Sequence, residues 1–386
     1  METVTHRAKW VVITPKEIIE NGYVTVTNGR ISASGHGRGP KSTQVKDHGA
    51  GILMPPLVNA HTHLDLTRLK GSIPPQNGFL SWVRAVIAGK AALTEGEILA
   101  GIFEGQQLLH QSGCALAADH RSFPFQTPSP GNPAIHVFHE YLGTVFPRAV
   151  PGDNGVSFSL AAHAPHTTAP TLIQELKQWC KNRNLVFSIH AAESPEEVEF
   201  ISRGTGKWAD FLESREISFQ GWGLPAPSPV RYLDRLGVLD GRTLAVHLVQ
   251  ADKTDLQILA RKGVRLCLCP RSNRNLLDQL PDVRLMVELG LRPALGTDSL
   301  ASVSSLDLLD EMRFLAQEVP GLSPFEIIAM GTVNGAWALG SEENTGTLEQ
   351  GKQGKMLFLP VDGVNSEAVI LRVLSGDLKA SAEWVL

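Results

Sequence analysis

Short segments in which apolar and polar residues alternate occupy the start of the chain. They lie at 10–14, 23–26 and 30–33, and Asn28-Gly29 joins the second segment to the third. Asn-Gly between two alternating segments is a strong hairpin signal, because both residues tolerate the positive φ angles of a tight turn. The pattern therefore predicts a small β domain at the start of the chain.

From Leu53 onward, short apolar runs alternate with segments that carry helix signals. Thr94-Glu95-Gly96-Glu97 predicts a capping box, and Ser323-Pro324-Phe325-Glu326 predicts another with proline at the first helical position. Eight strands that alternate with helices favour a (β/α)8 barrel of the TIM type over an open doubly wound sheet. The eight apolar runs that we expect to form these strands are Leu53–Ala60, Cys114–Asp119, Ala134–His139, Val156–Ala162, Leu185–Ile189, Thr243–Val246, Val264–Cys269 and Arg292–Gly296.

Composition agrees with one barrel and a smaller domain. The chain has 386 residues, and a barrel of this type needs about 250. Hydrophobic residues make up 42% of the chain, which is an ordinary value for a packed core. The net charge of -4 gives no general attraction to nucleic acid or to an anionic membrane. We therefore expect a small-molecule substrate and neither nucleic acid nor membrane as a partner.

The sequence also bears on cellular location. It has no run of 18 or more apolar residues, and charged residues stand where a signal peptide would carry its apolar stretch. The four cysteines are scattered, and a globular chain of this length needs no disulfide. A cytoplasmic location is the simplest expectation, and assembly into a homo-oligomer stays open.

Four of the expected strands end in residues that bind metals or transfer protons. His61-Thr62-His63 ends the first strand, and histidines two apart in an extended strand point to the same side. His190 and Glu193 stand at the end of the fifth strand. His247 ends the sixth, and Asp298 ends the eighth. Because the carboxyl ends of barrel strands meet at one mouth, we expect these side chains in one active site.

The order His-x-His, His-x-x-Glu, His and Asp resembles the amidohydrolase superfamily, in its branch of cytosine-deaminase-like and triazine-chlorohydrolase-like enzymes. The resemblance implies a metal-dependent (β/α)8 barrel over residues 51–344. Residues 346–359 return to β character and are similar to the closing strands of this superfamily, which implies a small β-sandwich domain formed by residues 1–50 and 345–386. The resemblance covers nearly the whole chain, because flanking segments also match: Asn59-Ala60, Cys269-Pro270-Arg271-Ser272-Asn273 and Thr332-Val333-Asn334-Gly335-Ala336.

This resemblance implies a role for each residue of the site. It implies proton transfer by Glu193, a hydrogen bond from His247 to the attacking hydroxide, and a proton-carrying role for Asp298. Relatives with two metals carry a carboxylated lysine on the fourth strand, and residues 157–163 contain no lysine. We therefore expect one divalent metal ion, with zinc first and iron or manganese also suited to the donors. The implied metal ligands are His61, His63, His190 and Asp298. The implied substrate contacts are His163, Trp82, Arg271, Ser272 and Asn273, although Arg271 could instead be an ordinary surface arginine.

Segments around the site indicate the reaction. They resemble those of the aminodeoxyfutalosine deaminases of this branch, which serve menaquinone biosynthesis. We therefore expect hydrolytic deamination of an aminated purine nucleoside, with aminodeoxyfutalosine, which carries a benzoate group, as the substrate. Long segments at 64–78 and 194–241 are expected to surround it, and an arginine such as Arg231 could meet its carboxylate. The similar segments are 61–66, 79–83, 140–143, 228–234 and 269–273.

Other reactions of the branch stay open. Adenosine and S-adenosylhomocysteine deaminases place a ribose-binding glutamate shortly after the position of Trp82, where this chain has Ala88-Gly89-Lys90-Ala91. That difference argues against a generic adenosine deaminase. Guanine deamination, chlorohydrolysis of a triazine and opening of a cyclic amide can all use the same metal chemistry. A non-catalytic barrel scaffold would usually lack ligands, whereas this chain keeps the full set.

Overall fold

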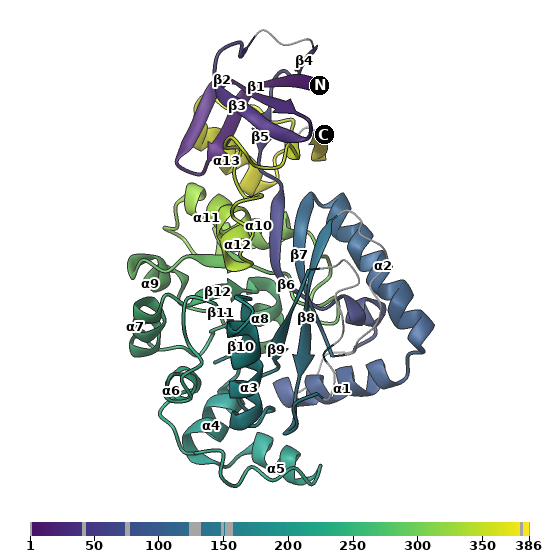
Figure 1. Ribbon diagram of the computed structural model, residues 1–386, viewed down its shortest axis with the longest axis vertical. Coiled ribbons are helices and arrows are strands. Elements are labelled where there is room, and N and C mark those ends of the chain that lie inside the picture. Colours follow the sequence, from purple (N-terminus) through teal and green to yellow (C-terminus); the bar gives the residue numbers. More distant parts are fainter. Residues whose placement is uncertain are drawn as a thin grey trace.

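A computed structural model describes residues 2–40, 44–73, 78–122, 133–147, 150, 157–378 and 381–385. It has two parts, a small sheet built from both ends of the chain and a larger barrel built from the segment between them (Figure 1). The two chain ends lie together at the small sheet. No helix in the described part combines the length and the apolar content that a membrane span needs.

Seven strands form the small sheet, in the order β15-β14-β5-β1-β2-β3, with β4 paired to β1. The predicted hairpin is confirmed, since Asn28 and Gly29 link β2 to β3 with φ angles of 50° and 75°. Apolar side chains of these strands pack into a core of their own, which includes Val11, Val24 and Met356. The strands are β1 (Thr3–Thr14), β2 (Glu17–Thr27), β3 (Arg30–His36), β4 (Gln44–Asp47), β5 (Ile52–Met54), β14 (Met356–Leu359) and β15 (Glu383–Val385).

Eight parallel strands form the second sheet, which runs in chain order from β6 to β13. The sheet closes between these two strands, where Asp298 donates its backbone N–H to the carbonyl of His61 (3.1 Å). The predicted (β/α)8 barrel is therefore confirmed, although residue 156 of the fourth predicted strand lies outside the described residues. The strands are β6 (Leu57–Thr62), β7 (Cys114–Arg121), β8 (Ala134–Tyr141), β9 (Phe158–Ala162), β10 (Phe187–Ala191), β11 (Thr243–His247), β12 (Arg265–Leu268) and β13 (Pro293–Leu295).

The first predicted strand, Leu53–Ala60, is two strands, so that prediction was wrong. β5 pairs with β1 and β14 of the small sheet, whereas β6 pairs with β7 of the barrel. Pro55-Pro56 separates them, because proline has no N–H to donate to a sheet. The division of the chain into 1–50 with 345–386 and 51–344 stays a proposal, and this pairing favours a first boundary at Pro55-Pro56.

Most helices lie around the barrel strands (Figure 1). Both predicted capping boxes are present, at Thr94 before α2 and at Ser323 before α11. Residues 194–241, expected as a long loop, instead contain α4, α5 and α6, because Ser194 and Ser228 cap the first and last of these helices. The helices are η1 (Leu64–Leu69), α1 (Phe79–Ala91), α2 (Glu95–Gln111), α3 (Pro170–Lys181), α4 (Pro195–Arg203), α5 (Lys207–Glu213), α6 (Pro229–Arg235), α7 (Lys253–Lys262), α8 (Pro270–Leu277), α9 (Val283–Glu288), α10 (Leu308–Glu318), α11 (Pro324–Gly331), α12 (Val333–Ala338) and α13 (Ser366–Ser375).

The direction of the barrel strands decides where a site can lie. β6 leads from the small sheet into the barrel, and β8 points toward the end where α1 and α5 lie (Figure 1). Because the strands are parallel, all of their carboxyl ends open at that end, opposite the small sheet. This is the end at which catalytic residues of such barrels are found.

Candidate active site

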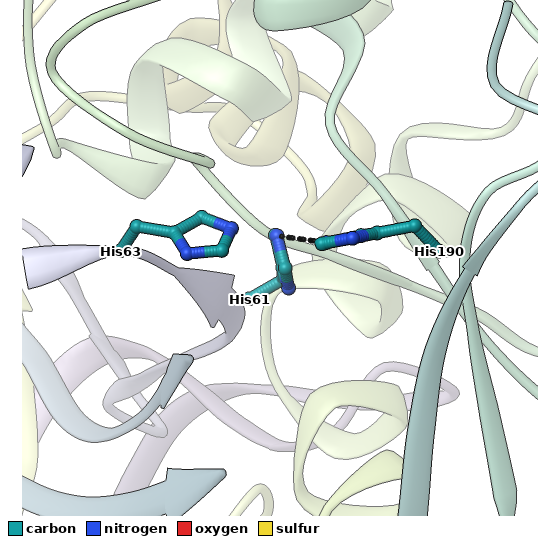
Figure 2. Close-up of side chains that lie close together, drawn as sticks. All are labelled: His61, His63 and His190. Atoms are coloured by element: carbon teal, nitrogen blue, oxygen red, sulfur yellow. Dashed lines mark hydrogen bonds between the residues drawn. The ribbon is translucent and has the colours of Figure 1, made fainter. Parts of the chain in front are cut away.

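Three histidines from two parts of the chain meet at the mouth of the barrel. His61 lies in β6, His63 follows that strand, and His190 lies in β10. Ring nitrogens of the three lie within 4.8 Å of one another, and Nε2 of His61 is 3.2 Å from Nε2 of His190. Figure 2 shows the rings of His63 and His190 on either side of the His61 ring. The fold thus brings together the three histidines that the sequence predicts as metal ligands.

Asp298 adjoins this group on the side of His61 and His63. Its Oδ1 lies 3.8 Å from Nε2 of each of these histidines. Its Oδ2 accepts hydrogen bonds from the hydroxyl groups of Ser272 (2.6 Å) and Ser302 (3.2 Å). The two serines therefore hold one carboxylate oxygen and leave the other facing the histidines.

The electrostatic environment of the three histidines suits a cation. Burial, and after it the neighbouring histidines, lower the pKa of His61 and of His190 well below the ordinary value. Both rings are therefore neutral at pH 7 and have a lone pair to offer. Burial also lowers the pKa of His63, but the carboxylates of Glu140 and Asp298 outweigh it and raise that pKa. The two carboxylates thus favour positive charge beside His63, and a bound metal ion can supply it.

The orientation of the rings also fits a metal. Nδ1 of His63 donates to the backbone carbonyl of His120 (3.0 Å), which leaves Nε2 of His63 for a ligand bond. Three imidazole nitrogens and one carboxylate oxygen are donors that a borderline divalent ion such as Zn²⁺ accepts. The residues present therefore fit the metal ion that the sequence predicts.

Glu193 lies in the turn between β10 and α4. Burial, followed by the charges of Asp298 and other carboxylates, raises the pKa of Glu193 well above its ordinary value. The carboxyl group therefore keeps its proton to a higher pH than a free glutamate does. Glu197 accepts the backbone N–H groups of Ala192 (2.9 Å) and Glu193 (2.7 Å). The turn that carries Glu193 is thus held by a second, fully buried carboxylate.

His247 ends β11 and faces Glu193, with Nε2 3.4 Å from Oε1 of that glutamate. Burial lowers the pKa of His247 to about 4, so the ring is neutral at pH 7. Nδ2 of Asn273 donates to Nδ1 of His247 (3.2 Å), which leaves the ring proton on Nε2. His247 therefore presents a hydrogen-bond donor beside Glu193.

The backbone is strained at the same strand ends. Ala192, His247, Leu248 and Asp298 have φ angles of 52°, 76°, 58° and 60°. Residues with a Cβ atom rarely adopt this left-handed region, and each such position costs roughly 1–3 kcal/mol. Strain of this kind gathers at functional sites, where the surrounding fold holds a side chain in a set position.

Two of the expected substrate contacts lie near predicted site residues. His163 lies beside the histidine group, and Trp82 contacts the segment that follows Asp298. The ring centroid of His163 is 5.1 Å from that of His190, and its Nδ1 shares a hydrogen bond with the hydroxyl of Thr167 (2.7 Å). Trp82 in α1 donates from Nε1 to the carbonyl of Ala301 (3.3 Å), in the segment that follows Asp298. Both residues stay proposed as substrate contacts.

Ser272 and Asn273, also expected to touch the substrate, are fully buried in the first turn of α8. The hydroxyl of Ser272 donates to Oδ2 of Asp298, and Nδ2 of Asn273 donates to Nδ1 of His247. Each residue therefore holds the side chain of a predicted catalytic residue. For these two residues we therefore propose a positioning role in place of substrate contact.

The guanidinium group of Arg271 is engaged by Glu311 and Ser305. Its Nε donates to Oε1 of Glu311 (2.7 Å), and Nη1 and Nη2 donate to Ser305 at 3.1 and 2.8 Å. The structure therefore gives Arg271 a place in the packing of α8 against α10, and its role as a substrate contact stays a prediction. It also differs from the surface arginine that we considered, because its side chain is only 14% exposed.

Removal of Arg271 is expected to destabilise the fold. Glu311 is fully buried, and burial raises its pKa to about 7 even with the arginine beside it. Arg271→Ala would leave this carboxylate without its guanidinium partner and with the backbone N–H of residue 271 (3.0 Å), a change that costs about 3–5 kcal/mol in the free energy of unfolding. Denaturant unfolding measures the loss. Arg274→Ala removes a more exposed arginine of the same helix and is the matched control, with an expected change below about 1 kcal/mol. Unchanged stability with a raised KM would restore Arg271 as a substrate contact.

Arg231 is also engaged by acidic side chains, and the expectation that it could meet a substrate carboxylate stays a prediction. Its Nε donates to Oδ1 of Asp255 (2.9 Å), and its Nη2 pairs with Asp252. These acceptors lie at the start of α7, and they bind the guanidinium group through Nε and Nη2.

The sequence analysis missed four residues that contact predicted site residues: His120, Glu140, Glu197 and Ser302. His120 had a signal, because it lies two positions after Ala118 and therefore on the same face of β7, toward the barrel interior. Glu197 had a signal too, since an acidic residue three positions after a serine N-cap is typical of helix starts. Glu140 stands in the similar segment 140–143, but nothing in that segment indicates its contact with His190, and Ser302 had no local signal.

Comparison with known proteins gives the family. The chain matches the amidohydrolase family over residues 144–378, more than half of its length. It is 29% identical over 345 residues to the aminodeoxyfutalosine deaminase of Deinococcus radiodurans, and the match covers 83% of this chain and 81% of that protein. It is 26% identical over 385 residues to the 5-methylthioadenosine/S-adenosylhomocysteine deaminase of Symbiobacterium thermophilum, covering 90% and 82%. The chain therefore belongs to the amidohydrolase family, as the sequence predicts.

Solved structures agree on the fold. The Helicobacter pylori aminofutalosine deaminase in complex with methylthio-coformycin matches with a TM-score of 0.84 at 24% identity, covering 97% of this chain and 96% of that one. An adenosine deaminase from Xanthomonas campestris with bound zinc matches with a TM-score of 0.76 at 22% identity, covering 96% and 88%. As an amidohydrolase, the protein is an enzyme that hydrolyses carbon–nitrogen bonds, and this prediction is confirmed.

Proposed function

We propose that this protein hydrolytically deaminates an aminated purine nucleoside. The observation that carries the proposal is the position of Glu193, a buried carboxyl group with a raised pKa that lies 3.4 Å from His247. Addition of water to a C–NH2 carbon beside a ring nitrogen requires a proton at that nitrogen, and such a carboxyl group can donate one. The three histidines and Asp298 lie at the same mouth of the barrel.

The side chains of the site would position the substrate and move protons. Glu193, in the turn held by Glu197, would give its proton to the ring nitrogen next to the aminated carbon. His247, with its ring proton on Nε2, would orient the attacking oxygen. Asp298 has one oxygen that the serines do not hold, and this oxygen would take the proton of the attacking oxygen and carry it to the amino group, which leaves as ammonia.

We propose one divalent metal ion, with His61, His63, His190 and Asp298 as its ligands. When bound, such an ion lowers the pKa of water from 15.7 toward about 7 and so makes hydroxide available at neutral pH. Zinc is our first choice, and iron and manganese are the alternatives. The proposal of zinc is supported by the zinc in the adenosine deaminase of Xanthomonas campestris. A single ion is supported by the absence of lysine in residues 157–163.

Among purine nucleosides, we propose aminodeoxyfutalosine as the preferred substrate. The relative from Deinococcus radiodurans that carries this name supports the choice. The part of α1 that follows Trp82 supports a difference from adenosine deaminases, because Lys90 there pairs with Asp65 (2.5 Å) in place of a ribose-binding glutamate. A second candidate is 5-methylthioadenosine or S-adenosylhomocysteine, because the relative with that name matches 90% of the chain. A cytoplasmic location and assembly into a homo-oligomer stay predictions.

The substrate proposal predicts an order of specificity. The kcat/KM for aminodeoxyfutalosine should exceed that for adenosine about tenfold or more, because a charge-assisted hydrogen bond to the benzoate contributes about 1.5–3 kcal/mol. The methyl ester of aminodeoxyfutalosine is the matched control, and it should lose most of this advantage. Ammonia release from the metal-loaded enzyme measures all three rates. Faster deamination of 5-methylthioadenosine would favour the second candidate, and faster chloride release from a triazine would overturn the deaminase proposal.

A further inference from the structure

Glu140 is a buried carboxylate that the proposed reaction does not use. It lies in β8, one residue before the end of the strand, and is only 5% exposed. Its Oε1 is buried and has no hydrogen-bond partner among the residues that the structure describes. A carboxylate oxygen in this state is costly, because burial removes its water without providing a donor in return. A hydrogen-bond donor that could pair with this oxygen must therefore lie close by.

That group is the imidazole of His190. Nδ1 of His190 lies 3.7 Å from Oε1 of Glu140, while Nε2 of the same ring lies 3.2 Å from Nε2 of His61. The two nitrogens thus face opposite ways, one toward the histidine group and the other toward the carboxylate. When the lone pair of Nε2 binds a metal, the proton of the neutral ring stays on Nδ1. The ring then presents a donor to an acceptor that has no other partner.

We propose that Glu140 is a positioning residue for the metal ligand His190 and accepts a hydrogen bond from its Nδ1–H when the ion is bound. This inference rests on the proposed metal-dependent function. A carboxylate that accepts from a ligand histidine fixes the orientation of the ring and makes its metal-binding nitrogen more basic. Loss of such a partner usually weakens metal binding about 10- to 100-fold.

The three histidines would then be supported in three different ways. Nδ1 of His63 donates to a neutral backbone carbonyl, that of His120, at 3.0 Å. Nδ1 of His61 is buried without a hydrogen-bond partner. His190 alone of the three faces a side-chain carboxylate through Nδ1 among the contacts of the described residues. Its contribution to metal affinity should therefore be the one that a single acidic side chain controls.

A competing role for Glu140 is to accept a hydroxyl group of the substrate sugar. The geometry favours the positioning role, because Oε1 lies 3.7 Å from Nδ1 of His190, whereas Nε2 of that ring is the nitrogen that faces His61. The two roles change different quantities. A positioning residue changes metal affinity in the absence of substrate, whereas a substrate contact changes KM at unchanged metal affinity.

The test is a zinc titration of metal-free protein in competition with a chromophoric chelator, with no substrate present. Glu140→Gln keeps the volume of the side chain and should weaken zinc binding about 10-fold, and Glu140→Ala should weaken it up to about 100-fold. The Tm of both metal-free variants should stay close to that of the unchanged protein. Glu175→Gln removes an exposed carboxylate from α3 and is the matched control, with no expected change in zinc affinity.

Unchanged zinc affinity in both Glu140 variants would overturn the inference, and a raised KM beside that affinity would assign Glu140 to the substrate. If Glu140→Ala does not fold, the isosteric Glu140→Gln decides alone. A protein that binds zinc as expected but deaminates no purine nucleoside would defeat the proposed function and leave the role of Glu140 standing, because the titration involves no substrate.

Discussion

His61→Ala is expected to lose the bound metal ion and the activity together. His61 is fully buried, and its Nε2 lies 3.2 Å from Nε2 of His190 and 3.8 Å from Oδ1 of Asp298. Removal of this central ligand leaves too few donors for tight binding, and without the ion the pKa of water returns toward 15.7. We expect ammonia release to fall at least about 10³-fold. Metal content per chain and turnover should be measured on the same preparation.

His36→Ala is the control for this experiment, because it removes an exposed imidazole of the small sheet. It should keep both metal and activity. The unchanged protein should hold close to one divalent ion per chain. Two tightly held ions per active chain would contradict the mononuclear site, and full turnover by His61→Ala would contradict the ligand set.

The second large effect is expected for Glu193→Gln, which should keep the metal and the fold but lose turnover. An amide of the same size can still pack between His247 and the turn held by Glu197, but it cannot give up and regain a proton. General acid–base catalysis by one residue contributes about 10²- to 10⁴-fold, and the fall in kcat should lie in this range or above it. Steady-state kinetics and metal analysis measure the two outcomes separately.

Glu196→Gln is the matched control for that substitution. Glu196 lies three residues further along, and its carboxylate pairs with exposed Lys207 (3.2 Å). Its loss should leave kcat within a factor of about two, since an ion pair of this kind contributes little. Near-normal turnover by Glu193→Gln would remove Glu193 from the mechanism.

The sequence was sufficient for the barrel and for the side chains at its strand ends. Each strand of a (β/α)8 barrel is a short apolar run, and a ligand at its carboxyl end is next to that run in the chain. His61, His190, His247 and Asp298 are therefore visible without knowledge of tertiary contacts. Pro55-Pro56 was visible too, but the continuous apolar character of residues 53–60 concealed the break between two sheets.

The sequence could not predict the tertiary contacts that hold the site residues and their neighbours in place. Arg271 lies in a segment that resembles the family, yet its partner Glu311 stands 40 residues away in the chain and binds the guanidinium group. Glu140 reaches His190 only because β8 and β10 are held apart by a single strand of a closed barrel. Such contacts depend on helix packing and strand order, and no local pattern of residues records them.

The left-handed backbone at His247 and Asp298 implies that thermal stability and the proposed catalysis place opposite demands on these two positions. Glycine at either position would relieve roughly 1–3 kcal/mol of strain, and at Asp298 it would also remove a buried carboxylate. Either change would also remove a side chain that the proposed reaction requires, so a gain in stability at these positions would be made at the expense of activity. Attempts to make the enzyme more robust for practical use should exclude these strand ends and draw on the small sheet and the outer faces of the helices.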